Sequence, residues 1–373
     1  IIPAPFDPRL ISFIPPAVAQ AAMDTGVARR PIVDTGAYVA QLSGRLDPLA
    51  GWLQTTFQKV RENPKRVIFA EGEDPAVISA ANTFFDQGFG HPILVGTTHK
   101  IKEEIKRIGL RTQADFEFVD TRESPYTEQF TDFLFERLQR RGYMRRDCQR
   151  LVMNERNVFS ALMVEHGYAD AMVSGVTRNW TSVYQDVHRV MDPDPNRNAI
   201  GVSLALSRGR AVMIADTSIH NMPTAEELAN IAEEAARAAQ NFGLVPRVAF
   251  LAYSTFGQPR GQRSDEVRDA VKILEERGVD FEFDGDMAAD VALNSDLMAQ
   301  FPFCRLTGTA NVLIMPAFHA ASISTKMLKT LGGATIIGPI LVGMSHSIQI
   351  CTLGSTDSDI VNMAALAAYD VNR

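Results

Sequence analysis

Cysteine is scarce in this sequence, and its three cysteines, Cys148, Cys304 and Cys351, lie far apart with no Cys-x-x-Cys spacing. This scarcity argues against a disulfide framework and against a zinc site, and it fits a reducing, cytoplasmic environment. Apolar runs are also short, since none approaches the roughly 18 residues that a membrane-spanning helix needs. No long basic block accompanies the formal net charge of −7. We therefore expect neither a membrane nor a nucleic acid among the partners of the chain.

The common phosphate-binding and catalytic signatures are missing as well. The sequence has no Gly-x-Gly-x-x-Gly, no Gly-x-x-x-x-Gly-Lys-Ser/Thr and no Gly-x-Ser-x-Gly nucleophile elbow. No cluster of His, Cys and Asp has the spacing of metal ligands, so we expect no metal site. The seven histidines are scattered singly, and we expect structural roles for them.

Short β-branched and aromatic runs alternate with helical periodicity over most of the chain. The predicted strands are RVIFAEG, HPILVG, FEFVD, ADAMVSG, RAVMIAD, RVAFLAY, VDFEFDG, NVLIMPAF and ATIIGPIL. Predicted helices include residues 74–87 and residues 98–108, and a Thr224-x-x-Glu227 capping box opens another. This alternation predicts an α/β fold with parallel, helix-covered sheets. The stiff Asp-Pro-Asp-Pro run at residues 192–195 indicates a seam between two parts of the chain.

Residues 1–35 have a different composition from the rest. Their proline density predicts that residues 1–16 do not continue as one helix, and a short helix is predicted over residues 17–24, stopped by Gly26. This segment has little to bury by itself, so we interpret it as an arm or linker that lies on another domain. The first residue is Ile1 with no signal peptide, and we expect the chain to be a piece of a longer protein.

Small hydroxyl residues collect where four predicted strands end. Backbone amides and hydroxyls at the carboxyl ends of parallel strands can hold phosphate or carbonyl oxygens. The same residues are also common in turns and helix caps, which is the alternative explanation. The four stretches are residues 174–182, 253–261, 316–324 and 352–359.

Five separated motifs resemble the phosphate acetyl/butyryltransferase family, in the family's own order. They are RVIFAEGEDPAVISAA, ADAMVSGVTRNWTS, PRVAFLAYST, NVLIMPAFHAASISTKMLKTLGGATIIGPILVGM and TDSDIVNMAALAAY. The resemblance covers about residues 45–373. Residues 1–32 resemble the end of the catalytic part of bacterial malic enzymes. Together the two segments are similar to the C-terminal portion of hybrid, NADP-dependent malic enzymes.

The resemblance implies a specific fold. It implies two parallel-sheet α/β/α domains with a cleft between them, related to the isocitrate and isopropylmalate dehydrogenases. The first domain is expected to contain residues 36–193 plus 340–373, and the second, inserted domain residues 194–339. Residues 1–35 are then the linker from the malic enzyme part.

The catalytic corner of the family is only partly retained. By this resemblance, active members carry Ser-Arg-Gly after the last strand and an Asp five residues beyond the Gly. The Asp takes the thiol proton of coenzyme A, and the Arg holds acetyl phosphate and stabilises the attacked carbonyl. The corresponding residues here are Thr352, Leu353, Gly354 and Asp359, so the acid is kept and the Arg is lost. Asp359 also completes a capping box with Thr356, which gives it a structural explanation.

Other family positions have changed too. A second family Arg corresponds to Gln185, and Asn-Ala-Gly-Asn is replaced by His-Ala-Ala-Ser at residues 319–322. Lys326 is retained where the family places a basic contact to coenzyme A, while an Arg one turn later is Thr330, with Lys329 beside it. Losing two charged groups at the reacting centre predicts a rate reduced by about 10⁴-fold or more.

The leading hypothesis is an acetyl-CoA-binding regulatory and oligomerisation domain of a hybrid malic enzyme, with transacetylase chemistry lost. Its partners are then acetyl-CoA or coenzyme A, the malic enzyme catalytic domain of the same chain, and further copies in a homodimer or higher oligomer. NADP and a divalent metal are expected only in the malic enzyme part. No catalytic residue is expected, Asp359 and Thr352 being remnants. The candidate acetyl-CoA-binding residues are Ser174, Thr177, Arg178, Ser254, Thr255, Lys326, Lys329, Thr352, Gly354 and Asp359.

Two alternatives remain. An active phosphate acetyltransferase would move acetyl groups between acetyl phosphate and coenzyme A, with Arg178 supplying the missing charge. A decarboxylating dehydrogenase on the related fold is disfavoured for this segment, because the nucleotide signature and a carboxylate cluster for a metal are absent.

Overall fold

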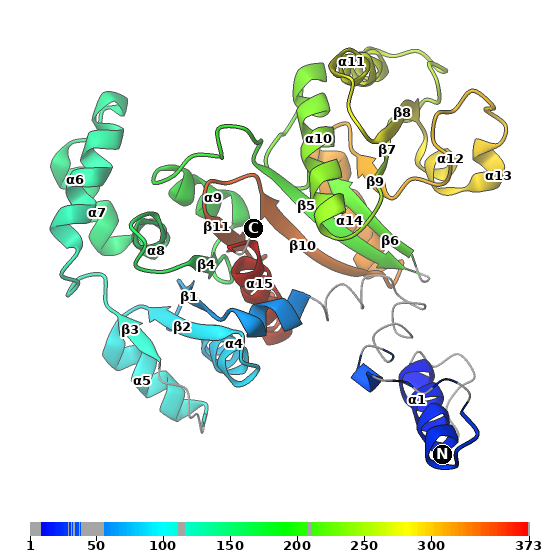
Figure 1. The fold of residues 1–373 in the computed structure, drawn as a ribbon. Coiled ribbons are helices and arrows are strands. Elements are labelled where there is room, and N and C mark those ends of the chain that lie inside the picture. Colours follow the sequence, from blue (N-terminus) through cyan, green and yellow to red (C-terminus); the bar gives the residue numbers. More distant parts are fainter. Residues whose placement is uncertain are drawn as a thin grey trace.

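Two β-sheets organise the chain in a computed structural model that describes residues 9–28, 30, 32, 34–36, 38, 56–110, 116–207 and 210–371 (Figure 1). The first sheet has the strand order β11-β4-β1-β2-β3, and all its pairs are parallel. Its strands are β1 (Lys65–Phe69), β2 (Gly90–Val95), β3 (Glu117–Val119), β4 (Ala171–Ser174) and β11 (Ser347–Ile350). The predicted α/β class is confirmed for this sheet.

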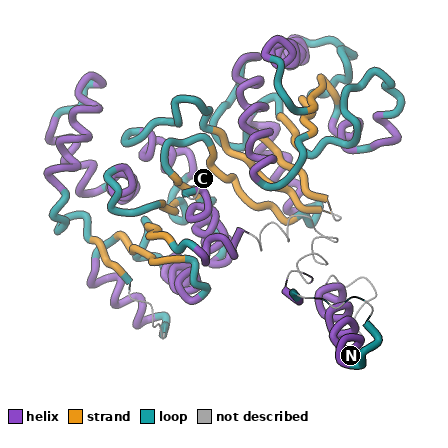
Figure 2. Tube along the Cα trace, viewed as in Figure 1, coloured by secondary structure: helices purple, strands orange, loops and turns teal. Residues whose placement is uncertain are grey.

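Both faces of the first sheet are buried because its strands are apolar throughout. Val67 and Phe69 point to one core, and Ile68 and Ala70, between and after them, point to the other. Helices therefore cover both faces, as the purple helices around the orange strands in Figure 2 show. They are α4 (Pro75–Asp86), α5 (Thr98–Arg107), α6 (Thr127–Leu138), η1 (Gln139–Arg141), α7 (Arg145–Asn154), α8 (Arg156–Glu165), α9 (Trp180–His188) and α15 (Asp357–Asp370).

The second sheet has the order β10-β5-β6-β9-β7-β8. Its strands are β5 (Ile200–Ser207), β6 (Arg210–Ala215), β7 (Arg247–Leu251), β8 (Glu282–Met287), β9 (Val312–Ile314) and β10 (Thr335–Val342). Its helices are α10 (Ala225–Asn241), α11 (Gln262–Arg277), α12 (Ala289–Leu293), α13 (Ser295–Met298) and α14 (Phe318–Thr330). α10 and α14 pack on opposite faces of this sheet.

The prediction that this sheet is parallel was wrong for the three strands β10, β5 and β6 at one edge. β5 pairs antiparallel with β6 and with β10. Only two residues separate β5 from β6, and such a short connection can join only antiparallel neighbours. β5 itself was missed. β10 also continues past residues 339 and 340, where the domain boundary was expected. The chain passes from the second sheet to the first only after Val342.

Local signals placed several helices correctly. Asp74 caps α4 by accepting from the amides of Ala76 and Val77, and Pro75 occupies the first helical position, where its missing N–H is not needed. The prediction for α1 (Arg9–Asp24) was wrong, because this helix includes both Pro15 and Pro16. The φ angle of proline is compatible with a helix, and the two prolines remove hydrogen-bond donors without ending it.

α1 lies apart from both sheets, and its Ile14 and Val18 are exposed (Figure 1). Within the part of the chain that the structure describes, no helix has the length and apolarity needed to cross a membrane.

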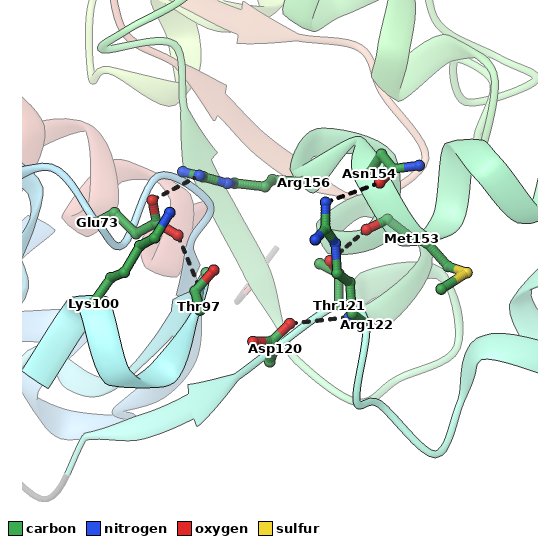
Figure 3. A pocket seen from close by; sticks show the side chains of 10 residues that line it. Glu73, Thr97, Lys100, Asp120, Thr121, Arg122, Met153, Asn154 and Arg156 are labelled. Carbon is green, nitrogen blue, oxygen red and sulfur yellow. Dashed lines mark hydrogen bonds and ion pairs between the residues drawn. The ribbon is translucent and has the colours of Figure 1, made fainter.

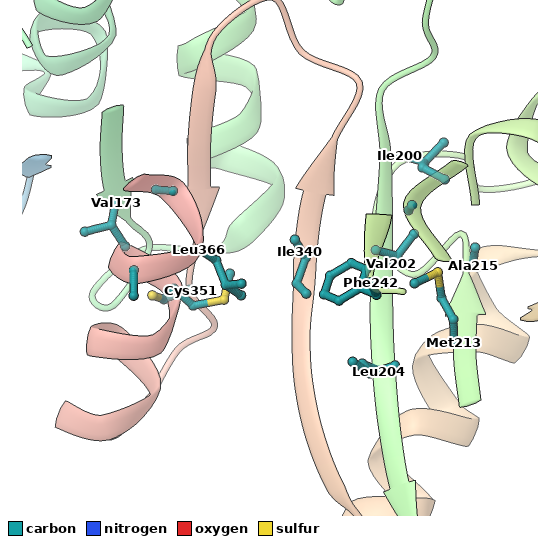
Figure 4. Close-up of a cluster of buried hydrophobic side chains, with 14 of the residues drawn as sticks. Val173, Ile200, Val202, Leu204, Met213, Ala215, Phe242, Ile340, Cys351 and Leu366 are labelled. Atoms are coloured by element: carbon teal, nitrogen blue, oxygen red, sulfur yellow. The ribbon is translucent and has the colours of Figure 1, made fainter. Parts of the chain in front are cut away.

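A continuous apolar core joins the two sheets. It includes Val173 and Cys351 beside the first sheet and Val202, Phe242 and Ile340 in the second (Figure 4). The two sheets therefore share buried surface instead of being held together only by the chain that connects them.

The chain passes twice between the sheets, and the two passages contact each other. The amide of Asp194 donates to the Gly343 carbonyl at 3.0 Å, and the amide of Ser345 donates to the Asp192 carbonyl at 3.3 Å. The acidic proline run at residues 192–195 lies in the first passage. This pairing places the two passages side by side.

Gln349 links the sheets by a two-point hydrogen bond. Its side chain is buried, with 2% of its surface exposed. The amide oxygen accepts from the Leu341 N–H at 3.0 Å, and the amide nitrogen donates to the Leu341 carbonyl at 3.0 Å. The side chain thus acts as a one-residue strand partner between β11 and β10.

We expect Gln349→Met to lower the free energy of unfolding by about 2–4 kcal/mol, because it leaves two buried backbone groups of Leu341 without partners. Urea unfolding followed by circular dichroism measures the change. Gln300→Met, at an exposed position, is the control and should change stability by less than about 0.5 kcal/mol. Equal effects of the two substitutions would contradict this role for Gln349.

Candidate ligand-binding cleft

A cleft of about 600 Å³ lies between elements of the two sheets. One side comes from the start of α9 and the loop after β11, and the other from α14, β5, β10 and the loop after β6. The lining residues are Asn179, Trp180, Thr181, Ser203, Thr217, Ser218, Phe318, Ser322, Thr325, Lys326, Lys329, Ile336, Gly338, Pro339, Thr352 and Leu353.

The loop after β6 is shaped by the buried carboxylate of Asp216. This carboxylate accepts from the backbone amides of Gly201 at 2.9 Å, Ser218 at 2.8 Å and His220 at 2.8 Å. It also contacts the His220 Nδ1 at 2.8 Å. A side chain at position 201 would collide with Ser218, whose Oγ lies 2.4 Å from an ideal Cβ there. The loop is therefore held by its hydrogen bonds to the Asp216 carboxylate and by the close packing of Ser218 against Gly201.

This contact changes the protonation of His220. Burial lowers the pKa of His220, but the hydrogen bond and the negative charge of Asp216 raise it more, so the pKa lies above its ordinary value of 6.5. When His220 is protonated, its Nδ1 donates a charge-assisted hydrogen bond to the ionised Asp216, next to the loop that lines the cleft.

An irregularity in β10 forms the floor of the cleft. The pairing with β5 shifts between Ile337 and Ile340, at the Gly338-Pro339 step. Gly338 has a φ of +119°, and an ideal Cβ there would lie 2.7 Å from the Val202 carbonyl oxygen, so glycine is needed. The Ser203 hydroxyl, opposite this irregularity, donates to the Thr217 hydroxyl at 3.1 Å.

The corner between β11 and α15 retains its shape. Asp359 Oδ2 accepts from the Thr356 amide at 3.0 Å and from its hydroxyl at 2.9 Å, which is the predicted capping box. Asp359 lines a smaller recess of about 40 Å³, next to the cleft, together with Lys329 and Thr352. Leu353 lines the cleft itself and is 59% exposed. Asp359 is thus engaged in a helix cap, and Leu353 is an apolar residue at the position that corresponds to Arg in the resembling family.

Cys351 also borders this smaller recess. Its complete burial raises the pKa of the thiol, and the charges of Glu71 and Asp359 raise it further. The thiol therefore stays neutral, which does not suit a nucleophile. No group of three or more potential metal ligands occurs among the described residues.

The lining of the cleft is positively charged. Lys326 and Lys329 project from α14, and the described lining contains no carboxylate. Neither lysine has an ion-pair partner within the described residues. An anionic ligand would therefore meet two uncompensated charges at this end of the cleft.

Two polar atoms at the cleft lack hydrogen-bond partners. The Trp180 Nε1 and the Ser218 Oγ are both buried and unpaired within the described part of the chain. Buried polar groups without partners are unfavourable by about 1–3 kcal/mol each, but neighbouring atoms cover these two, so a ligand in the cleft does not reach them in this conformation.

Four of the ten predicted binding residues line the cleft or its smaller recess, and a fifth lies in the turn between two of them. Lys326, Lys329 and Thr352 line the cleft, Asp359 lines the recess, and Gly354 forms the turn between them with a φ of +75°.

The other half are engaged elsewhere. Ser174 donates to the Asn157 side chain at 2.7 Å. Thr177 donates its hydroxyl to Glu71 at 2.6 Å, and Arg178 pairs with Glu155 at 2.7 Å.

On the second sheet, the predicted hydroxyls also face inward. Ser254 is fully buried and hydrogen-bonds to Asp286 and Ser264, and Thr255 accepts from the Ala288 amide at 3.1 Å. None of these residues lines the cleft in the described structure, and neither does Gln185.

Sequence reasoning missed several cleft residues. Trp180 lies inside a hydroxyl-rich stretch that was recognised, but its bulk drew no separate prediction. Ser203 and Thr217 belong to β5 and to the loop that faces it, and they could not be assigned while β5 was unrecognised.

Comparison with known proteins identifies the chain's relatives. A family profile described as phosphate acetyl/butaryl transferase matches residues 52–368. The NADP-dependent malic enzyme of Rhizobium meliloti is 57% identical over 371 residues, covering 99% of this chain and 49% of that protein. The phosphate acetyltransferase of Clostridium acetobutylicum is 27% identical over 330 residues, covering 86% of this chain and 98% of that protein.

The fold has a solved counterpart. The crystal structure of a phosphotransacetylase from Streptococcus pyogenes matches with a TM-score of 0.78 at 27% identity, covering 86% of this chain and 98% of that one. The chain spans about half the length of the malic enzymes that it matches.

We expect the stabilising effect of His220 to depend on pH. The folded protein binds its proton more tightly than the unfolded chain does. The contribution is therefore fully present below about pH 6.5 and is lost as pH rises through the raised pKa. His220→Asn should thus lower the free energy of unfolding more at about pH 6 than at about pH 9, as measured by urea unfolding. An equal loss at both pH values would show that the Asp216 contact does not hold a proton.

Proposed function

Because the chain belongs to the phosphate acetyl/butaryl transferase family, we propose that it binds acetyl-CoA or coenzyme A in the cleft and regulates an attached malic enzyme without catalysing acetyl transfer. The observation that carries the proposal is the distribution of charge in the cleft. Two lysines without carboxylate partners line one end, while Leu353 stands at the corner where the family resemblance calls for Arg.

The cleft has the groups that an acyl-coenzyme A ligand needs. Its phosphates would be held by Lys326 and Lys329 on α14. Its amide and thioester carbonyl groups need hydrogen bonds instead of ions, and hydroxyl-bearing residues such as Thr181 and Ser322 line the cleft. Thr352, at the edge of the same cleft, supplies a further hydroxyl.

The same cleft is poorly equipped for the chemistry. Transfer to or from acetyl phosphate requires a preorganised charge at the attacked carbonyl, and removing one such donor costs about 10²–10³ in rate. Leu353 has neither charge nor donor. Arg178, the alternative source of charge, is paired with Glu155 at 2.7 Å and does not line the cleft. Asp359 has a structural reason to be present, since it caps α15.

The malic enzyme connection rests on the longer relatives. The Rhizobium meliloti protein, 57% identical, is named an NADP-dependent malic enzyme, and this chain matches about half of it. We infer that the natural polypeptide also contains a malic enzyme part, which would hold NADP and a divalent metal. Regulation then requires that acetyl-CoA bind two states of the whole protein unequally.

We further propose two domains, one around each sheet, with the second inserted in the first as in isocitrate and isopropylmalate dehydrogenases. We also propose a homodimer or higher oligomer. Ile323, Met327 and Leu331 are exposed along the side of α14 that does not line the cleft, and a second copy of the chain would bury them.

An active phosphate acetyltransferase is the second candidate. It is favoured by the match to the Clostridium acetobutylicum enzyme over nearly that protein's whole length. The two candidates differ in one measurable quantity, the rate of acetyl transfer.

We expect the chain to turn over acetyl phosphate and coenzyme A at least about 10⁴-fold more slowly than an ordinary enzyme with a turnover of about 10 s⁻¹. Leu353→Arg alone should not restore the rate, because Gln185 and residues 319–322 have also departed from the family pattern. The assay follows acetyl-CoA formation. Turnover by the unmodified chain within about tenfold of 10 s⁻¹ would favour the second candidate.

We expect acetyl-CoA to raise the melting temperature of the chain, because binding to the folded state alone adds about 2.7 kcal/mol at a hundredfold excess over Kd. Lys326→Ala should weaken this shift without lowering the melting temperature of the free protein, since Lys326 is exposed. Lys106→Ala, exposed on α5, is the matched control and should leave the shift unchanged.

Thermal scans with acetyl-CoA, coenzyme A and acetyl phosphate provide the comparison. The regulatory proposal fails if none of the three shifts the melting temperature, or if acetyl phosphate alone does.

A further inference from the structure

A second cavity, of about 170 Å³, lies at the carboxyl edge of the first sheet (Figure 3). Its lining comes from the loops after β1, β2 and β3 and from the junction of α7 with α8. It shares no lining residue with the cleft described above. We call it the basic recess, and its lining residues are Glu73, Gly96, Thr97, Lys100, Asp120, Thr121, Arg122, Met153, Asn154 and Arg156.

Glu73 organises one side of the basic recess. Its Oε1 accepts from the Thr97 amide at 2.9 Å, and its Oε2 accepts from the Arg156 guanidinium at 3.0 Å. Gly96 has a φ of +155°, and an ideal Cβ there would lie 3.1 Å from the Glu73 Cγ, so the absence of a side chain allows Glu73 to lie across the end of β2. Both carboxylate oxygens are thus engaged by neighbours.

The protonation of Glu73 agrees with this arrangement. Burial raises the pKa of Glu73, but the Thr97 amide and the charges of Arg156 and Lys100 lower it more, so the net shift is downward. Glu73 is therefore a permanent anion that positions Arg156 beside the cavity.

The other two cations of the basic recess form no close ion pair within the described residues, although the charge of Lys100 acts on Glu73 from a longer distance. The Arg122 guanidinium donates to the Asn154 side-chain oxygen at 3.3 Å, a neutral acceptor. Lys100 forms no hydrogen bond or ion pair with any residue that the structure describes. The Asp120 Oδ1 accepts from the Arg122 backbone amide at 3.0 Å, so this carboxylate is engaged in its own turn.

The charges do not balance. Three cations, Lys100, Arg122 and Arg156, face two carboxylates, Glu73 and Asp120. The cations come from three different parts of the chain, yet Figure 3 shows Lys100 and Arg156 converging on Glu73, with Arg122 across the cavity. An anion between them would complete the set.

We propose that the basic recess binds a phosphate group, either free or as the ester of a small molecule. Guanidinium and ammonium groups that line one small cavity favour a compact oxyanion with several acceptor oxygens. α5 adds to this preference, because its N-cap Thr97 and its first-turn Lys100 both line the cavity and the positive end of the helix faces it.

The size of the basic recess limits the ligand. A cavity of about 170 Å³ holds a phosphate group with a short substituent, and a larger ligand would have to extend out of it into solvent. It is thus too small to enclose the ligand proposed for the cleft, and the inference does not depend on that proposal.

The test is a calorimetric titration of the full chain with inorganic phosphate at constant ionic strength. We expect Lys100→Gln and Arg122→Gln each to weaken binding at least about tenfold, because each removes a charge-assisted hydrogen bond. Both side chains are exposed, so the variants should fold normally, which thermal scans check. Lys106→Gln is the matched control, because Lys106 lies in the last turn of α5 and does not line the basic recess. This variant should bind phosphate as the unmodified chain does.

Two further arms separate the possible ligands and sites. A titration with glycerol 3-phosphate distinguishes a phosphate ester from free phosphate by which of the two binds more tightly. The proposal is overturned if the full chain binds neither. It is also overturned if phosphate binding is lost in Lys326→Ala but not in the two recess variants, since the cleft would then be the site, or if succinate binds and phosphate does not.

Discussion

The side-chain amide of Gln349 forms two hydrogen bonds with the backbone of Leu341, and the placement of one sheet against the other depends on this contact. β11 belongs to the first sheet and β10 to the second, so the contact fixes the point where the chain changes sheet. The shared apolar core around Val173 and Val202 holds the same junction from the inside. Because the walls of the cleft come from both sheets, these interactions hold the two walls in place relative to each other.

Buried carboxylates form the next level of organisation. Glu71, Asp216 and Asp286 lie at or just after the ends of β1, β6 and β8, and each accepts hydrogen bonds from the loop after a strand. This arrangement satisfies backbone amides that would otherwise be buried without partners. It also uses up hydroxyl groups, such as those of Thr177 and Ser254, that might have contacted a ligand. In the loop after β6, the Asp216 carboxylate accepts from the backbone amides, and Thr217 and Ser218 of the same loop line the cleft.

The corner between β11 and α15 shows why a retained acid is not by itself evidence of catalysis. The capping box of Thr356 and Asp359 stabilises the start of α15 whether or not the acid takes a proton from a substrate. Leu353 occupies an exposed position at the cleft, where replacement of a charged residue does not disturb the core. The positive charges that line the cleft lie on α14, and one of them, Lys329, also borders the recess that contains Asp359.

Local patterns in the sequence determined the α/β class, the ends of α4 and α5 and both capping boxes, because caps and periodicity depend on neighbours within a few residues. The order of the motifs also indicated the family. Tertiary structure decided the rest. β5 was not recognised, so its antiparallel pairing with the next strand, β6, was not foreseen, and its pairing with β10 joins residues more than a hundred positions apart. Likewise, Thr177 and Thr217 both lie in loops after strands, but only Thr217 lines the cleft. The local sequence does not show this difference, because it depends on how the two sheets are placed against each other.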